Sequence, residues 1–449
     1  MQNGNIEIHR QVTPGAALPR RTVAAVVLGS AFEFYDFMLY AMFAPVIARV
    51  FFPAGNPRNS LLLALAGYGL GFLARPAGAV LIGHIADRRG RKPALLLSLG
   101  LMGAGTLLLA LVPPYAAIGV AAPVLVVAAR LLQGLSAGGE IGAASALLLE
   151  HGPVRRRGEL MGWQIASQGM AALVATGIAM LVHLSLSAAA VESWGWRLPF
   201  LAGLLIVPVG LLLRGRLHEA PLPSPSRAPL AALLRGHRRT LLLAIGLMAG
   251  GTVQMQLTSQ YLPTYLQSRL HYPPAFSYLI SALVGLLLLL APLAGRLGDG
   301  FRRRRHLLYV ACGLTLLLTV PAFAALVSGP ERGMAWALLP IGAMTLLYCL
   351  GTGTGLSVLL EGFPPALRAT ALGVAYGSGL VLFGGATPFV VAWLTDVSGA
   401  ALMPAYYLMA ASALSAVALW FYPDPTVAET HAAEVPAFAC AGEVPGRQA

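Results

Sequence analysis

The sequence is dominated by about twelve apolar runs, and each is long enough to cross a bilayer as a helix, which takes about 20 mostly apolar residues. We place these spans at residues 22–51, 61–83, 94–112, 118–149, 160–184, 196–213, 241–265, 276–294, 307–326, 336–360, 370–393 and 403–422. Such a series of runs predicts an all-α, polytopic membrane protein with twelve transmembrane helices.

The composition agrees with a membrane protein, because 57% of the residues are apolar and 10% charged, against roughly 45–50% and about 25% in a soluble domain. A long polar stretch between the sixth and seventh spans divides the spans six and six. We therefore predict a cytoplasmic segment at 1–21, an N-terminal bundle at 22–213, a linker at 214–240, a C-terminal bundle at 241–422 and a disordered cytoplasmic tail at 423–449.

The charges are mostly basic, with 30 Lys and Arg residues against 17 Asp and Glu and a formal net charge of +13. With the N-terminus inside, 23 of the cations fall on the cytoplasmic face, five on the opposite face and two within spans. This asymmetry predicts a multi-pass protein of the cell inner (plasma) membrane with both termini in the cytoplasm. It also argues against a nucleic-acid partner. A signal peptide is the alternative for the first run, but that run far exceeds a signal's apolar core of about 7–15 residues.

Two loops recur within the chain. The loop at residues 83–92 (GHIADRRGRK) returns in weaker form 212 residues later, and residues 148–162 resemble residues 359–373 at an offset of 211. Two matches at nearly one offset indicate a duplicated six-span unit. Because six is even, the halves are parallel bundles, and a transporter of this architecture binds its substrate between them near the bilayer midplane.

Several motifs carry a family resemblance. The loop at residues 83–92 and the element RLLQG at 130–134 resemble signatures of the major facilitator superfamily. More narrowly, residues 33–40, 75–78, 133–140, 194–200 and 383–388 are similar to the metabolite:proton symporter family, and residues 163–168 and 261–265 most resemble its citrate and tricarballylate branch. The resemblance implies the major facilitator fold and proton-coupled transport. One departure is Arg302, which stands where the first-half loop has Gly90 and weakens the expectation of a latch there.

Five ionisable residues are predicted to lie inside spans, all in the first half: Glu33, Asp36, Arg75, Arg130 and Glu140. Each costs roughly 2.5–3.5 kcal/mol on insertion scales when it faces lipid. We therefore expect these side chains to face the protein interior and to serve a function.

Glu33 and Asp36 are three residues apart and share a helix face with Tyr40. Two carboxylates this close in a low-dielectric site do not both ionise readily, so one is expected to carry a proton. The family resemblance implies that Asp36 and Arg130 exchange an ion pair as the proton loads and leaves. A static pair that holds helices together is the alternative. Glu140 is a further proton-coupling candidate, or else a structural hydrogen-bond partner.

Arg75 precedes Pro76, which can bend the second span. Its guanidinium can clamp a substrate carboxylate, stabilise the bend or pair with Glu33, and the sequence does not separate these roles. Arg130 is the second cation expected to meet an anion.

Neutral polar side chains provide further candidate substrate contacts. They are Tyr40, Gln164, Ser167, Gln168, Gln254, Thr258, Tyr261, Tyr265, Tyr348 and Tyr376. The four on the seventh span share one face at α-helical spacing. Amides and hydroxyls suit carboxylate and hydroxyl oxygens, and ordinary hydrogen bonding between helices is the alternative.

The loops also predict a cytoplasmic gate. Its residues are Gly83, Asp87, Arg88, Gly90, Arg91 and, in the second half, Asp299. An aspartate there can cap a helix and pair with an arginine in one conformation and release it in another. The alternative is that the arginines only fix topology.

We expect a secondary active transporter that imports a small organic acid anion, such as a citrate-like tri- or dicarboxylate, together with a proton by alternating access. We expect it to act as a monomer without metal or other cofactor. Alternatives are a proton symporter for a shikimate-like acid, betaine or proline, a drug:proton antiporter, and a non-transporting sensor. Such antiporters carry a glycine-proline signature in the fifth span, which has no proline here. No constellation of residues predicts an enzyme, and three scattered cysteines indicate neither disulfides nor a metal site.

Overall fold

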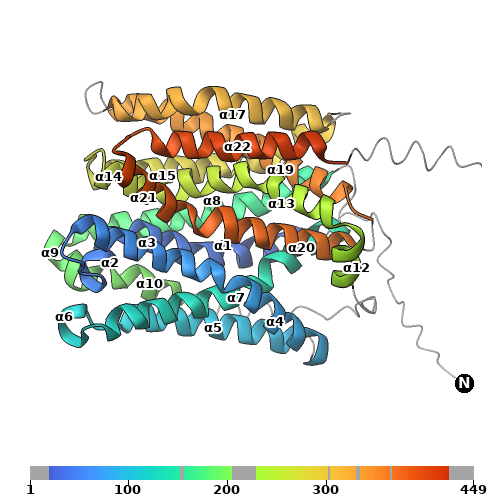
Figure 1. Ribbon diagram of the computed structural model, residues 1–449. Coiled ribbons are helices and arrows are strands. Elements are labelled where there is room, and N and C mark those ends of the chain that lie inside the picture. Colours follow the sequence, from blue (N-terminus) through green and yellow to red (C-terminus); the bar gives the residue numbers. More distant parts are fainter. Residues whose placement is uncertain are drawn as a thin grey trace, which may run out of the picture.

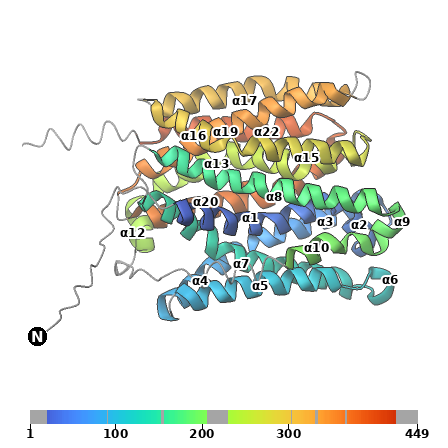
Figure 2. The same cartoon turned by 180° about the vertical axis from the view of Figure 1, so that it is seen from behind.

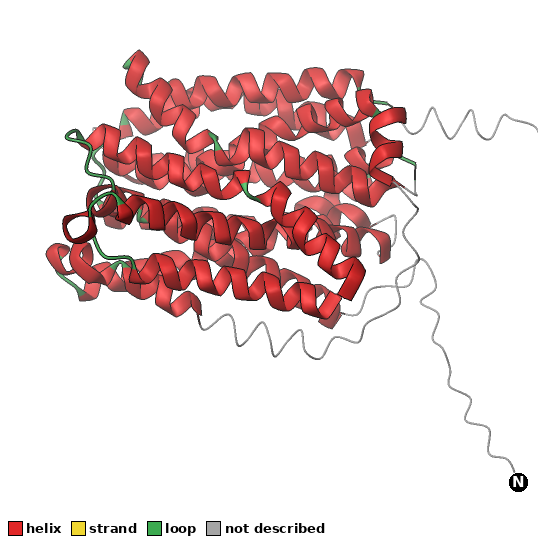
Figure 3. Ribbon diagram, turned by 60° about the horizontal axis from the view of Figure 1, so that its bottom comes forward, coloured by secondary structure: helices red, strands yellow, loops and turns green. Residues whose placement is uncertain are grey.

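The computed structural model describes residues 20–89, 91–151, 156–204, 229–301, 304–329, 334–364 and 367–423. Within these ranges every regular element is a helix, as Figure 3 shows. The first half contains α1 (Arg20–Met42), α2 (Ala44–Phe51), α3 (Pro57–Leu73), α4 (Arg75–Arg89), α5 (Arg91–Leu111), α6 (Tyr115–Ile118), α7 (Ala121–His151), α8 (Arg157–Ser185), α9 (Ala188–Ala190), the π-helix η2 (Val191–Gly195) and α10 (Arg197–Leu204).

The second half repeats this all-helical organisation. It contains α12 (Pro229–Gly236), α13 (Arg238–Met255), the π-helix η3 (Gln256–Tyr261), α14 (Leu262–Ser268), α15 (Pro274–Leu288), α16 (Ala291–Gly300), α17 (Arg304–Val327), the 3-10 helix η4 (Met334–Ala337), α19 (Leu338–Glu361), α20 (Arg368–Gly379), the π-helix η6 (Leu380–Gly385), α21 (Thr387–Ser398) and α22 (Met403–Phe421). In Figure 1 the helices run side by side, with α5 and α7 at the bottom and α17 and α22 at the top.

The helices match the predicted spans. Among the described residues, nine helical segments are long and apolar enough to cross a membrane, and the pair α1 and α2, bent by 67°, makes a tenth. Pro45 in the first turn of α2 accounts for the bend, because it has no N–H to continue the ladder of α1. The predicted third span is the shorter apolar helix Leu96–Leu111, and the sixth is described only to Leu204. These helices confirm the all-α, twelve-span fold, while the segment expected as a linker contains α12 in its described part.

Among the described residues, a turn of π-helix lies just before a proline in three places. The turns are η2 before Pro199, η3 before Pro263 and η6 before Pro388. Proline has no N–H, so the carbonyl four residues earlier, inside each π turn, loses its helical partner. At η6 the side chain of Gln256 replaces the missing donor, with Nε2 3.0 Å from the Gly384 oxygen.

The two halves meet along α8, which packs against α15 and α16, and along α3, which packs against η6 and α21. Figure 2 shows α8 between α1 and α15. Glycines on α8 permit this close approach. A methyl group at Gly158, Gly162 or Gly169 would lie 2.5 Å from the backbone oxygen of Gly295, Ala291 or Gly285, respectively. Small residues on facing helices let their backbones pack directly, so the halves meet largely through main chain here.

Candidate functional site

Four of the five predicted intramembrane charges lie in one buried cluster in the first half. Glu33 and Arg75 form an ion pair, with Arg75 Nη2 3.4 Å from Glu33 Oε1. Asp36 and Arg130 are also buried, and Arg130 is 0% exposed. The two carboxylates and two guanidinium groups together carry no net charge when both acids are ionised.

Asp36 and Arg130 form no direct ion pair among the described residues, because the side chain of Gln133 bridges them. Arg130 Nη1 donates to Gln133 Oε1 at 2.6 Å, and Gln133 Nε2 lies 3.4 Å from Asp36 Oδ2. Gln133 Nε2 also donates to Thr106 Oγ1 at 3.0 Å, and the Thr106 hydroxyl donates to Asp36 Oδ2. The direct pair that the resemblance implied is therefore replaced, in this conformation, by a hydrogen-bonded chain.

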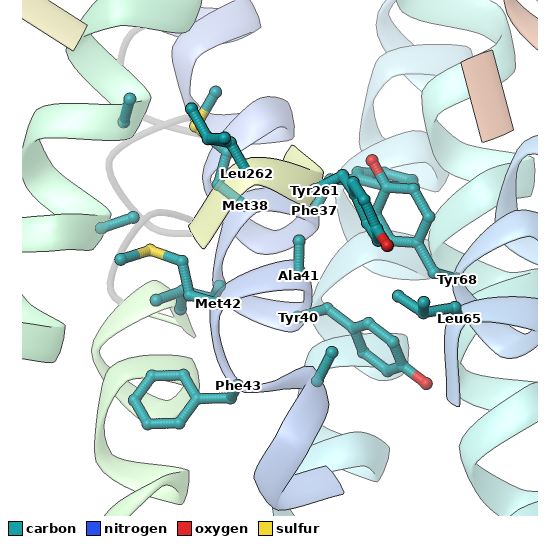
Figure 4. Close-up of a cluster of buried hydrophobic side chains, with 14 of the residues drawn as sticks. Phe37, Met38, Tyr40, Ala41, Met42, Phe43, Leu65, Tyr68, Tyr261 and Leu262 are labelled. Carbon is teal, nitrogen blue, oxygen red and sulfur yellow. The ribbon is translucent and has the colours of Figure 1, made fainter. Parts of the chain in front are cut away.

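Aromatic rings surround both guanidinium groups. The Arg130 Cζ lies 4.3 Å from the ring centroid of Phe37, 4.6 Å from Tyr40 and 5.6 Å from Tyr68, and the Arg75 Cζ lies 4.7 Å from Phe37 and 4.3 Å from Phe72. Figure 4 shows Phe37, Tyr40 and Tyr68 among the buried hydrophobic side chains. Ring faces stabilise a cation without neutralising it. Arg130 Nε and Nη2 have no hydrogen-bond partner among the described groups, so two donors are left for an anion.

The second half meets this cluster with neutral groups. Gln256 of η3 donates to the Tyr68 hydroxyl at 3.1 Å, and Thr264 of α14 donates to the Ala41 carbonyl at 3.1 Å. Gln260 lies between these two at the same spacing and is 2% exposed, and its Oε1 has no hydrogen-bond partner among the described residues. Contacts from Gln256 and Thr264 thus mark the face of the seventh span that is turned toward the first half.

The stripe predicted on the seventh span makes its hydrogen bonds elsewhere. Gln254 Nε2 donates to the Met344 carbonyl at 2.7 Å, Thr258 donates to the Gln254 carbonyl at 2.8 Å, and the Tyr265 hydroxyl donates to the Ala401 carbonyl at 2.5 Å. The rings of Tyr261 and Tyr265 are 5.8 Å apart. These partners all belong to the second half. A substrate role for this stripe stays a prediction.

Of the predicted polar residues on the fifth span, Gln164 contacts the first span. Gln164 Nε2 donates to Ser30 Oγ at 3.0 Å, and the Ser167 hydroxyl donates to the Gln164 carbonyl at 2.6 Å. Gln168 is 1% exposed, and neither end of its amide has a partner among the described residues. Of these three residues, Gln168 therefore has the most hydrogen-bonding capacity to offer a ligand. On the first span, the Tyr40 hydroxyl donates to the Ala64 carbonyl at 3.0 Å.

Tyr348 and Tyr376 line a cavity of about 100 Å³ among α13, α17, α19, α20 and α22. Gln254 and Ile165, the latter from α8, line it as well. Tyr376 also lies within electrostatic range of Arg75. The structure thus brings these predicted second-half residues together, next to the charged cluster rather than inside it.

Asp299 joins the two halves at one end of the molecule. Its carboxylate accepts hydrogen bonds from the backbone N–H groups of Gly158 and Glu159, each at 3.0 Å, in the first turn of α8. It also pairs with Arg304 at 3.1 Å, which in turn contacts Glu361 at 2.6 Å. A carboxylate at a helix N-terminus is stabilised by the free N–H groups and by the helix dipole. The contact exists although Arg302 replaces the first-half glycine.

The remaining predicted gate residues are less defined. Gly90 lies outside the described residues, as does Arg302. Gly83, Asp87, Arg88, Arg91 and, in α7, Glu140 lie on described helices, but their side chains are outside the described part. Their roles stay predictions.

A second contact between the halves lies at the opposite end of α8. The Tyr278 hydroxyl of α15 is 3.0 Å from His183 Nδ1 and 3.2 Å from Nε2, and the His183 ring stacks on Phe43 at 5.7 Å. Sequence reasoning missed this contact, as it missed Thr106, Gln133, Gln256 and Gln260. For Gln133 the signal was its place between Arg130 and Gly134 in a recognised motif. Within the described residues no cluster of His, Cys, Asp or Glu is arranged to hold a metal ion.

Comparison with known proteins agrees with this architecture. The family model described as Major Facilitator Superfamily matches residues 26–386. A citrate-proton symporter of Salmonella typhi is 35% identical over 408 residues, covering 89% of this chain and 93% of the relative. A proline/betaine transporter of Escherichia coli (strain K12) is 33% identical, covering 87% of this chain and 80% of the relative.

The fold also matches solved structures. The crystal structure of a D-xylose-proton symporter superimposes with a TM-score of 0.73 at 18% identity, over 90% of this chain and 98% of the other. An identity this low shows the fold alone. The family model matches most of the chain, and the citrate-proton symporter is 35% identical to it, against 18% for the solved structure. The chain therefore belongs to the major facilitator superfamily, and citrate-proton symporters are among its relatives.

Proposed function

We propose that the protein takes up a small organic acid anion of the citrate-like class together with a proton. The observation that carries this proposal is the charge balance of the buried cluster. Glu33, Asp36, Arg75 and Arg130 sum to zero when both acids are ionised and to one positive charge when one acid takes up a proton. A net charge is costly in a low-dielectric site, so a bound proton favours a bound anion and the reverse.

A zwitterion such as proline or betaine is the second candidate, because proline/betaine transporters are 33% identical to this chain. A quaternary ammonium group binds well when it lies against aromatic faces. Here the faces of Phe37 and Tyr40 already hold Arg130. A second cation would have to displace that guanidinium, so the geometry favours an anion.

We place the end of the molecule that carries Asp299 on the cytoplasmic side of the inner membrane. We place both termini on that side too, as the distribution of arginines predicts. Rocking of the halves then alternates access. Opening to the cytoplasm breaks the Asp299 contact with α8, and opening to the outside breaks the contact between His183 and Tyr278.

Uptake into proteoliposomes tests the proposal. Radiolabelled citrate, tricarballylate, dicarboxylates, shikimate, proline and glycine betaine are offered under an imposed pH gradient, with and without an uncoupler. We expect one of the acids to accumulate, and the uncoupler to abolish its accumulation. Accumulation of proline or betaine alone would establish the second candidate. Uptake that does not depend on the pH gradient would reject proton coupling.

Asp299→Asn should open the proposed cytoplasmic gate. The variant loses the charge that pairs with Arg304 and caps α8, so we expect the equilibrium to shift toward the inward-open state by about tenfold, the effect of one charge-assisted hydrogen bond. Spin labels at positions 156 and 296, on opposite halves, report the separation. The matched control is Glu192→Gln, which removes an exposed ion pair with Arg49 within the first half. An unchanged distance distribution in Asp299→Asn would show that the contact is not a gate.

A pair of variants separates a substrate-binding role of Arg75 from its ion pair with Glu33. Arg75→Met alone leaves Glu33 buried without this cation, and we expect a loss of about 3–5 kcal/mol of stability in detergent. The double variant Glu33→Gln/Arg75→Met removes both charges and should recover most of that loss. If Arg75 also contacts the anion, the double variant binds it about tenfold more weakly. Unchanged affinity in a folded double variant would remove Arg75 from the substrate site.

A further inference from the structure

We propose that Thr106 and Gln133 are positioning residues that couple the occupancy of Arg130 to the proton on Asp36. The inference rests on the proposed function and deepens it, because it names the route by which substrate and proton influence each other. The route is the hydrogen-bonded chain from Arg130 through Gln133 and Thr106 to Asp36.

The direction of this chain is fixed by chemistry. Arginine has donors and no acceptor, so the 2.6 Å contact with Arg130 requires the oxygen of the Gln133 amide on that side. The NH2 group of Gln133 is therefore turned toward Thr106 and Asp36. Thr106 accepts from that NH2 group, which leaves its single hydroxyl proton for Asp36. Every donor in the chain points toward the carboxylate.

The hydrogen bonds to the Asp36 carboxylate thus go to one of its two oxygens. Both donors reach Oδ2, while Oδ1 is buried and has no hydrogen-bond partner among the described residues. Oδ1 faces α10 at Gly203, where an added methyl group would lie 3.1 Å from it. A proton can bind Oδ1 without displacing either donor. We therefore assign Oδ1 as the atom that is protonated.

The charged and titratable groups around Asp36 come from three helices. Glu33 and Tyr35 lie on its own helix, Arg75 on α4 and Arg130 on α7. Among the described residues, α5 contacts Asp36 through Thr106, and α10 approaches it at Gly203. Arg130 therefore acts on Asp36 both through space and through the amide of Gln133.

The coupling follows because the contact with Arg130 fixes the orientation of the Gln133 amide. When a substrate carboxylate binds the free Nε and Nη2 donors of Arg130, the guanidinium is drawn toward the anion and its Nη1 contact with Gln133 Oε1 weakens, so the Gln133 NH2 group supports the ionised Asp36 carboxylate less firmly. Asp36 then takes up a proton more readily. By reciprocity, a proton on Asp36 makes Arg130 more available to the anion. A direct ion pair would hold Asp36 ionised more firmly than this bridge of neutral groups does.

Infrared titration of the purified, full-length protein tests the inference. The carboxylic acid band that disappears in Asp36→Asn reports the proton on Asp36. We expect its midpoint to move to higher pH by about one unit in Thr106→Val and in Gln133→Leu, because the ionised form loses a donor. Thr106→Ser keeps the hydroxyl and should retain the wild-type midpoint. Thr319→Val, which removes a buried hydroxyl whose hydrogen bond in the described part of the chain goes to the Thr315 carbonyl, is the matched control.

Citrate is the probe for coupling. We expect citrate to raise the midpoint in the wild type and to have less than half that effect in Gln133→Leu. An unmoved midpoint in both Thr106→Val and Gln133→Leu would overturn the inference, and Thr106→Val alone decides this point if Gln133→Leu does not fold. The titration without citrate needs no transport. Failure of wild-type accumulation in proteoliposomes therefore counts against the proposed function, while an unmoved titration counts against the chain through Gln133.

Discussion

Asp36→Asn is expected to abolish accumulation of the substrate against its gradient while leaving exchange of substrate across the membrane. A gradient of two pH units supplies about 2.7 kcal/mol per proton, which supports about 100-fold accumulation at one proton per substrate when the membrane potential is held at zero. Asparagine carries no exchangeable charge, so the accumulation ratio should fall to about 1. Its amide oxygen can still accept the hydrogen bond from Thr106, so the neutral side chain mimics the loaded acid.

Glu33→Gln is the matched variant for this test. It removes the other carboxylate of the cluster, which pairs with Arg75, and leaves the chain of Thr106 and Gln133 on Asp36 intact. We expect it to retain accumulation that depends on the pH gradient. The wild-type accumulation ratio also gives the proton stoichiometry. If Asp36→Asn still accumulates substrate about 100-fold while Glu33→Gln does not, the proton carrier is Glu33, and the assignment to Asp36 is wrong.

The sequence predicts those features of the fold whose alternatives would cost much free energy, such as a charge that faces lipid. A charged residue in a span is expensive unless it is buried in protein, so Glu33, Asp36, Arg75 and Arg130 could be singled out by their type alone. The structure places all four in one buried cluster. The apolar runs likewise predict the helices because their length is set by the thickness of the bilayer.

Neutral hydrogen-bonding residues carry no comparable signal. Thr106 has no sequence signal in its apolar helix, and Gln133 has only its place in the motif at 130–134, so the role of both follows from the tertiary contacts that place them between Asp36 and Arg130. The contact of His183 with Tyr278 depends in the same way on the packing of α8 against α15. Side-chain partners between helices are set by helix rotation, which spacing along one helix does not determine.

The seventh span shows a further limit of reasoning from spacing. A constant 3.6-residue period put Gln254 and Thr258 on one face with Tyr265, but the hydrogen bonds of these three residues are to second-half carbonyls. Gln256 and Thr264 contact the first half instead. Spacing alone does not show which face meets the other half, although Pro263, which leaves the carbonyl four residues earlier without a helical donor, was a cue for the irregular turn at η3.

Arg130→Lys is expected to weaken binding of the anion by about 10- to 100-fold although it keeps the charge, because a hydrogen bond to a charged group contributes about 1.5–3 kcal/mol. The guanidinium lies between the rings of Phe37 and Tyr40, donates to Gln133 and still has Nε and Nη2 free. A compact ammonium group lacks the planar fork needed to make all these contacts at once. The apparent affinity for the transported acid in exchange measures the loss.

Arg197→Lys is the control for a change of guanidinium to ammonium against an aromatic ring. Arg197 lies 4.6 Å from the ring centroid of Trp196 and donates to the Val112 carbonyl, outside the charged cluster. We expect this variant to bind the anion as the wild type does. If Arg130→Lys binds equally well, then point charge alone suffices at that position, and the two free donors of Arg130 do not recognise the substrate. The acid would then have to be held by Arg75 and the neutral amides, of which Gln168 and Gln260 have unused hydrogen-bonding capacity among the described residues.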